Sequence, residues 1–165
     1  VGRGHSPEHT ALYCPALKLL ISGDQVLPRI TPNVSVFPTE PEGDPLREWL
    51  RSCVILRETL PDDLLVLPAH ETPFHGLHVR LNQIVASHER GMLSLFNYLT
   101  EPRRAVDCFP ALFSREIEQG SIGLATGETL AHLNCLLGQH RITRTQDESG
   151  VDWYEQIAET ADFEE

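Results

Sequence analysis

Apolar and polar positions in the first third of the chain predict two short strands, a long loop and a helix. Residues 10–15 and 18–22 are short and mostly apolar and are separated by a turn, so they predict a β-hairpin. Residues 25–43 contain four prolines and a glycine, which predict an irregular surface loop. After Asp44, which we expect to cap a helix, apolar residues recur every three or four positions to about Leu60.

The rest of the chain predicts a buried strand, further helices and a second hairpin. Residues 63–67 are apolar after the first position and lie between turn residues, which favours a buried strand. Large apolar residues follow the helical period over 81–99, and shorter helical patterns cover 107–113 and 125–137. Residues 141–154 contain two strand-like runs around a polar turn and predict a terminal hairpin. The mixture of strands and helices is typical of an α/β fold.

Length and charge exclude some classes of protein. A chain of 165 residues with 41% hydrophobic residues can bury the core of one domain, or of a small domain with a subdomain. Eight of the 24 acidic residues lie in the last twenty positions, without a single lysine or arginine, so we expect a solvated acidic tail at 156–165. Because the basic residues are not clustered, we expect no nucleic-acid partner. No apolar run reaches the roughly 20 residues that cross a membrane, so we expect no membrane partner.

Cysteine usage and the start of the chain add two expectations. The four cysteines are scattered and form no Cys-x-x-Cys pair, which predicts reduced thiols in a cytoplasmic protein. All basic residues but one are arginine, as in proteins from GC-rich genomes, and we expect a bacterial source. The chain begins at Val1 and its first candidate motif begins at residue 4. We therefore expect it to be part of something longer.

Three side chains of the kind that bind divalent metals end apolar stretches or lie in turns beside them. They are His5, Asp24 and His70. Ligands at strand ends are held by a rigid sheet, and imidazole with carboxylate suits zinc or another first-row divalent ion. Each also has an ordinary structural explanation, because Asp24 can cap the turn that follows it and a lone histidine is often only a hydrogen-bonded structural residue. Together the three favour a metal site at one edge of the sheet.

The segments around these residues resemble the later metal motifs of metallo-β-lactamase-fold hydrolases, and most closely those of the glyoxalase II-like branch. The matching segments are Gly4-His5-Ser6-Pro7-Glu8-His9, Ile21-Ser22-Gly23-Asp24-Gln25-Val26-Leu27-Pro28 and Leu67-Pro68-Ala69-His70-Glu71-Thr72-Pro73-Phe74. The resemblance covers about residues 2–155. It implies that 1–76 form the second half of an αββα sandwich, and that 77–155 form a helical, winged-helix-like subdomain.

The resemblance also implies chemistry. His5 would bind the first of two divalent ions, His70 would bind the second, and Asp24 would bridge both and act in catalysis. The ions would be zinc, with iron or manganese as alternatives, and the reaction would be hydrolysis of a thioester or related small acyl substrate. The family's earlier motif, His-x-His-x-Asp-His, is not found in this sequence. Three ligands do not complete a two-ion site, so the resemblance implies an incomplete C-terminal portion that is inactive alone.

Three further residues and two alternatives complete the expectations. His9, His78 and Arg80 would support the ligands or contact substrate, for which Arg80 could clamp a carboxylate, although a solvated helix face is equally compatible with the pattern. Half a sandwich would expose a sheet face, to be covered by a missing N-terminal half or by a homo-oligomer. The alternatives are a non-catalytic interaction module with residual ligands and an RNA-processing member of the same fold. Helix 125–137 has no basic residue, which argues against RNA.

Overall fold

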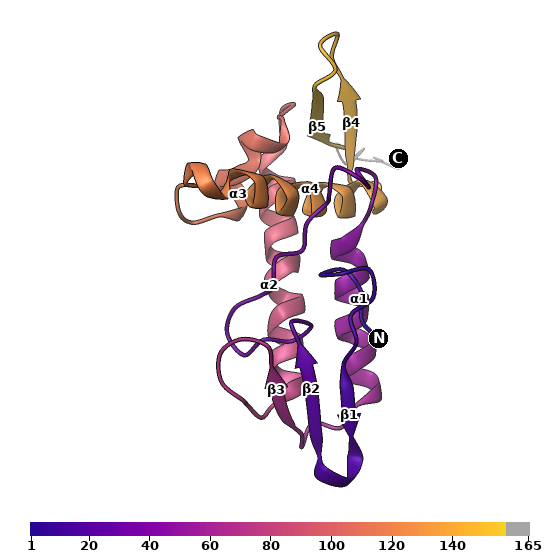
Figure 1. Cartoon of the computed structure of the whole chain (residues 1–165). Coiled ribbons are helices and arrows are strands. Elements are labelled where there is room, and N and C mark those ends of the chain that lie inside the picture. The colour runs from indigo at the N-terminus through magenta and orange to yellow at the C-terminus, as the bar shows by residue number, and fades with distance from the viewer. Residues whose placement is uncertain (158–165) are drawn as a thin grey trace, which may run out of the picture.

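A small sheet packed on two long helices forms the larger end of the molecule (Figure 1). The computed structural model describes residues 1–157, so most of the predicted acidic tail lies outside the described residues. The sheet has the strand order β1-β2-β3. The elements of this end are β1 (Leu12–Cys14), β2 (Leu19–Gly23), α1 (Pro45–Thr59), β3 (Leu65–Pro68) and α2 (Leu77–Tyr98).

The predicted hairpin, helix and strand are all confirmed. β1 and β2 pair antiparallel across a single 3₁₀ turn, η1 (Pro15–Leu17), which ends at Lys18 in the left-handed conformation. Asp44 caps α1, because its carboxylate accepts a hydrogen bond of 3.1 Å from the backbone N–H of Arg47. β3 then pairs parallel to β2, which requires the long connection that α1 provides. The predicted α/β fold class is therefore confirmed.

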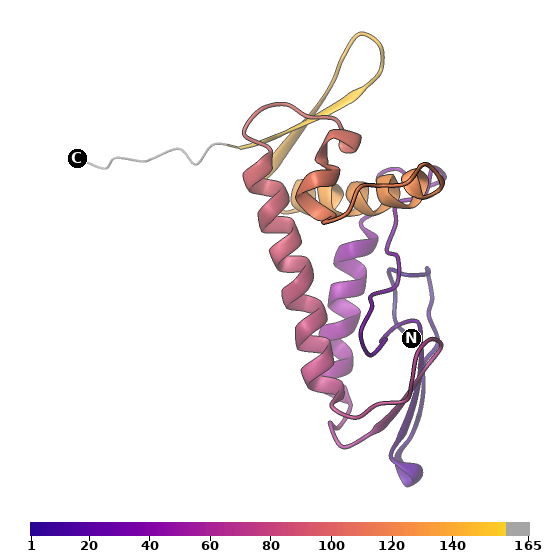
Figure 2. The same cartoon turned by 90° about the vertical axis from the view of Figure 1, so that its left-hand side faces the viewer.

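The two faces of the sheet have different surroundings. Leu20 and Val66, which face each other across β2 and β3, are buried under the helices with at most 1% of their surfaces exposed. Figure 2 shows α1 and α2 on that side of the sheet. The opposite face is also apolar, yet Leu12 is 59% exposed and its partner Ile21 is 45% exposed. This face carries Leu12, Cys14, Leu19, Ile21, Leu65 and Leu67, and we call it the open face.

The smaller end crosses the far ends of α1 and α2 (Figures 1 and 2). It comprises η2 (Ala105–Cys108), α3 (Phe109–Leu112), η3 (Gln119–Ser121), α4 (Ile122–Gly138), β4 (Ile142–Gln146) and β5 (Asp152–Gln156). The terminal hairpin β4–β5 is confirmed, with Arg144 opposite Tyr154. The helix predicted over 107–113 is confirmed in part, because a 3₁₀ turn there leads directly into one α-turn. Pro110 has no N–H to continue the hydrogen bonds of the preceding turn. The winged-helix description and the domain boundary at 76 stay predictions.

One apolar core joins the two ends. It includes Trp49 of α1, Leu81 and Leu95 of α2, and Leu133 of α4, none more than 1% exposed. All four cysteines are free thiols, and burial raises the pKa of Cys53 to about 12, so this thiol is an inert part of the core. In the part of the chain that the structure describes, no helix has both the length and the apolar character to cross a membrane.

Candidate metal centre

His5 lies in a short N-terminal loop that is fastened to α1. Gly2 and His9 close the loop with two backbone hydrogen bonds of 2.7 and 2.8 Å. The N–H of Arg3 donates to Ser52 of α1 at 2.9 Å. Gly4 has φ +106° and touches α1 so closely that a Cβ there would lie 2.3 Å from Cβ of Trp49. Only glycine meets both conditions, so the backbone before His5 is fixed against the helix.

Asp24 and His70 come together because they follow two neighbouring parallel strands. β2 ends at Gly23 and β3 at Pro68, and these two residues are paired in the sheet. The N–H of Ala69 donates to the carbonyl of Gly23 at 3.1 Å, which ties the two outgoing loops together. Parallel strands end at the same edge of a sheet, and this is a preferred place for a site in an α/β fold.

The structure brings all three predicted ligands together. Nε2 of His5 lies 3.6 Å from Oδ2 of Asp24, and Nε2 of His70 lies 3.4 Å from Oδ1 of the same carboxylate. Two ligands that each lie about 2.1 Å from one tetrahedral ion are about 3.4 Å apart, so both distances leave room for an ion between the donors. Asp24 thus has one imidazole at each of its oxygens.

These side chains have free donor atoms of the kind that a divalent ion needs. Oδ1 of Asp24 is buried without a hydrogen-bond partner. Nδ1 of His5 lies 2.9 Å from the carbonyl oxygen of Asn33, which can only accept, so Nδ1 donates there and Nε2 is the nitrogen that faces Asp24. When Nε2 carries a lone pair, a divalent ion between it and the carboxylate would satisfy both groups. Among residues 1–157, however, no group of three or more histidine, cysteine or acidic side chains is arranged to hold one ion. Each imidazole faces a different oxygen, so each position has two donors.

The three supporting residues lie in different places. His9 packs beside His5, with ring centroids 6.1 Å apart, and its Nε2 donates to the carbonyl of Ser22 at 3.1 Å. This bond holds the end of β2, which directly precedes Asp24. His78 is directed to the end of α1, where its Nε2 donates to the carbonyl of Leu60 at 2.7 Å.

Arg80 anchors the loop that follows Asp24. Its guanidinium donates to the carbonyls of Leu27 and Ile30 at 2.6 and 2.7 Å. Two N–H groups of Arg80 that could bind a substrate carboxylate are therefore already bonded to the backbone. Roles of His9, His78 and Arg80 toward a substrate stay predictions.

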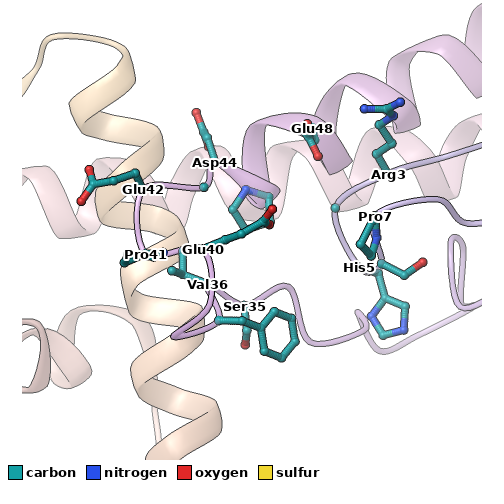
Figure 3. A pocket seen from close by; sticks show the side chains of 15 residues that line it. Arg3, His5, Pro7, Ser35, Val36, Glu40, Pro41, Glu42, Asp44 and Glu48 are labelled. Atoms are coloured by element: carbon teal, nitrogen blue, oxygen red, sulfur yellow. The ribbon is translucent and has the colours of Figure 1, made fainter.

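A cavity of about 480 Å³ opens beside His5, between the N-terminal loop and the start of α1 (Figure 3). Its rim carries more acidic than basic groups. Arg3 is the one lysine or arginine among the lining residues, and the acidic ones are Glu40, Glu42, Asp44 and Glu48. Apolar walls come from Pro7, Val36, Phe37, Pro41 and Pro45. The volume suits a small molecule, and the acidic rim would repel a polyanion.

Sequence reasoning missed two residues near the centre. Asn33 holds His5 through its backbone carbonyl, and its side chain donates to Glu128 of α4 at 3.4 Å. No sequence pattern identifies a residue that acts through its main chain. Glu128 lies more than 100 positions from His5, and only the fold brings the two near each other.

Two other histidines form a separate, buried pair. Nδ1 of His88 lies 3.2 Å from Nε2 of His132, whose Nδ1 donates to the carbonyl of Glu128 at 2.8 Å. His88 packs edge-on against Trp49 with ring centroids 5.0 Å apart. Burial, and then the neighbouring His132, lower the pKa of His88 to about 4. His88 is therefore a neutral interior residue of the core.

Comparison with known families gives two matches along the chain. Residues 1–70 match the model of the metallo-β-lactamase superfamily. Residues 93–157 match the model of the C-terminal domain of metallo-β-lactamase-like proteins. No curated protein matches the sequence.

Two solved structures are similar to almost the whole chain. A β-lactamase domain protein from Burkholderia ambifaria is 41% identical with a TM-score of 0.90, over 94% of this chain and 46% of the other. A metallo-β-lactamase family protein from Thermus thermophilus is 26% identical with a TM-score of 0.80, over 94% of this chain and 47% of the other. The chain therefore spans less than half the length of these relatives. Each half of the chain thus matches a domain model of metallo-β-lactamase-type proteins.

Proposed function

We propose that this chain supplies His5, Asp24 and His70 to a two-ion centre that hydrolyses a thioester or related acyl substrate. One observation carries the proposal: the carboxylate of Asp24 lies between the Nε2 atoms of His5 and His70, with one oxygen toward each. A carboxylate in this arrangement can bridge two ions. The superfamily match supports metal-dependent hydrolysis, while zinc and the glyoxalase II-like substrate class rest on the motif resemblance.

The chain's own residues would hold and orient the centre. Divalent ions at such a site supply hydroxide at neutral pH and polarise a carbonyl group. Asp24 fixes the spacing of the two positions, since both of its oxygens belong to one rigid group. The carbonyl of Asn33 keeps the Nε2 lone pair of His5 directed at its position. The bond between Ala69 and Gly23 keeps the loop of His70 beside that of Asp24.

The surroundings of the centre favour a small substrate over RNA. The cavity beside His5 would admit an acyl group, with Val36 and Phe37 as an apolar wall. Its acidic rim would repel a phosphate backbone. We therefore infer a small acyl substrate and no nucleic-acid partner.

We further propose that the open face is the inner face of a two-sheet sandwich, covered by the half that this chain does not contain. Monomers rarely expose an apolar patch as continuous as Leu12, Ile21 and their neighbours. The relatives are about twice as long as this chain, which leaves enough polypeptide for a second sheet. The same half would bring the ligands that the two positions lack.

The test compares the gene product that contains this chain with the 165-residue chain alone. We expect about two zinc, iron or manganese ions per molecule of the former, with hydrolysis of an acyl thioester. The isolated chain should bind metal weakly and show no appreciable turnover, because two donors per position do not hold an ion tightly.

Three results would contradict the proposal. Turnover by the isolated chain would show that upstream ligands are dispensable. A gene product without metal or activity would favour a non-catalytic interaction module. A stable homodimer of the isolated chain, joined through the open face, would show that a second copy covers that face.

A further inference from the structure

The orientation of His5 depends on a segment that belongs to neither its loop nor the sheet. The carbonyl of Asn33 accepts the Nδ1–H of His5 at 2.9 Å, and Asn33 lies 28 residues further along the chain. If this carbonyl moved away, the ring could turn or take the other tautomer, with its proton on Nε2. That tautomer cannot bind an ion through Nε2. The position of residue 33 therefore decides which nitrogen faces Asp24.

The segment around residue 33 is held by α4 through three contacts. The N–H of Val36 donates to the carbonyl of Gly127 at 3.0 Å. The side-chain amide of Asn33 donates to Oε2 of Glu128 at 3.4 Å. Gly127 lets the two backbones meet, since a Cβ there would lie 2.8 Å from Oγ of Ser35. Ser35 in turn donates to Oδ1 of Asn33, so both ends of that amide are engaged.

Glu128 is not an ordinary surface acid. Burial raises its pKa, while the hydrogen bond from Asn33 acts in the opposite direction. Its backbone carbonyl also accepts the hydrogen bond from the buried His132. A partly buried carboxyl group costs stability unless it keeps a hydrogen bond, and Asn33 is the partner that Glu128 has here.

We propose that Glu128 and Asn33 are positioning residues through which the C-terminal region sets the tautomer of His5. This inference rests on the proposed function for its consequence, although not for its geometry. It assigns to α4 a part in the metal centre. Outer hydrogen-bond partners of this kind alter metal affinity about 10- to 100-fold in metalloproteins.

The first test reads the tautomer directly in the metal-free 165-residue chain, by long-range ¹H–¹⁵N NMR of the His5 ring above pH 8. In the unaltered chain we expect the proton on Nδ1. Glu128→Ala should move the ring toward a mixture of tautomers. Asn33→Ala should do the same: the backbone carbonyl remains, but the side-chain amide that anchors residue 33 to Glu128 is lost. Glu128→Gln, which keeps an acceptor oxygen, should behave like the unaltered chain. Glu89→Ala, at an exposed glutamate of α2, is the matched control.

The double variant Asn33→Ala/Glu128→Ala separates positioning from general packing. If the two residues act as one unit, the second substitution adds little to the tautomer change caused by the first. The inference is overturned if Glu128→Ala folds with the unaltered tautomer. It is also overturned if Glu128→Gln is as disruptive as Glu128→Ala. If Glu128→Ala does not fold, the tautomer of His5 in the Asn33→Ala chain decides instead, and an unaltered tautomer there overturns the inference.

The second test measures metal in the gene product that contains this chain. Zinc affinity should fall about 10- to 100-fold in Glu128→Ala and stay within about threefold in Glu128→Gln. If the unaltered gene product binds no metal while the tautomer results hold, the proposed function fails and the positioning network stands. If metal binds normally in every variant and the tautomer never changes, the network fails and the proposed function stands.

Discussion

Two pairs of histidines occupy this molecule under opposite conditions. His5 and His70 stand on either side of Asp24, with side chains 29% and 65% exposed and their Nε2 atoms directed at a carboxylate. His88 and His132 are buried and bonded to each other, and in residues 1–157 neither forms an ion pair with a carboxylate. In the first pair both Nε2 atoms face the carboxylate of Asp24. In the second pair, Nδ1 of His88 and Nε2 of His132 are hydrogen-bonded to each other.

The comparison shows what distinguishes a proposed ligand from a core histidine. Burial without a counter-charge lowers the pKa of His88 and keeps it neutral, which suits packing against Trp49. A ligand needs instead an accessible nitrogen, a fixed tautomer and an acid nearby. His5 has all three, because Asn33 fixes its ring and Asp24 faces it.

The largest effect on activity is expected at Asp24, the carboxylate between His5 and His70. Asp24→Ala should lower acyl-thioester turnover of the gene product at least about a thousandfold, because one residue serves both ions. Bound metal, measured by elemental analysis, should fall at both positions. Asp63→Ala, at an exposed acid paired with Lys18, is the control and should leave both quantities unchanged. Normal metal content and turnover in Asp24→Ala would remove the ligand assignment.

Removal of a buried ring should act on stability. His88→Ala deletes a packed side chain and leaves Nε2 of His132 without its donor. We expect the free energy of unfolding to fall by about 2–4 kcal/mol in urea denaturation of the 165-residue chain. A change below about 0.5 kcal/mol would show that this ring is not a core element.

The buried pair also predicts a pH dependence. His88 is neutral in the folded chain down to about pH 4 but takes up a proton near 6.5 when unfolded, so the unfolded state binds more protons between these values. Its contribution is complete above pH 6.5 and is lost as the pH falls to 4, by on the order of 3 kcal/mol. His88→Phe should flatten the dependence of unfolding free energy on pH in this window. An identical pH profile in both chains would contradict the assignment.

The smallest effect on stability is expected at His70, the more exposed histidine of the first pair. His70→Ala removes a side chain that is 65% exposed, so the free energy of unfolding of the 165-residue chain should change by less than about 0.5 kcal/mol. In the gene product, the same substitution should lower bound metal from about two ions to about one. A large loss of stability without loss of metal would make His70 a structural residue, like His88.

Much of the fold was predictable because local patterns agree with it. The hairpin at residues 12–23, the helix capped by Asp44 and the strand at 65–68 depend on turn residues, a cap and a short apolar run. The helix predicted over 107–113 is helical but changes from 3₁₀ to α just before Pro110, which the sequence did not predict. Competing turn geometries differ little in energy over so few residues, and local sequence does not separate them.

For the site, sequence and structure decided different things. The sequence by itself determined which side chains are candidates for the chemistry and that Asp24 and His70 follow strands, because residue type and strand ends are local properties. Only the tertiary structure decided that these strands are neighbours and that His5 reaches them. It alone also placed the carbonyl of Asn33 and the carboxyl group of Glu128 behind the centre. The reason is physical: a contact between residues 28 or 95 positions apart depends on how whole elements pack, and a main-chain acceptor leaves no mark in the sequence.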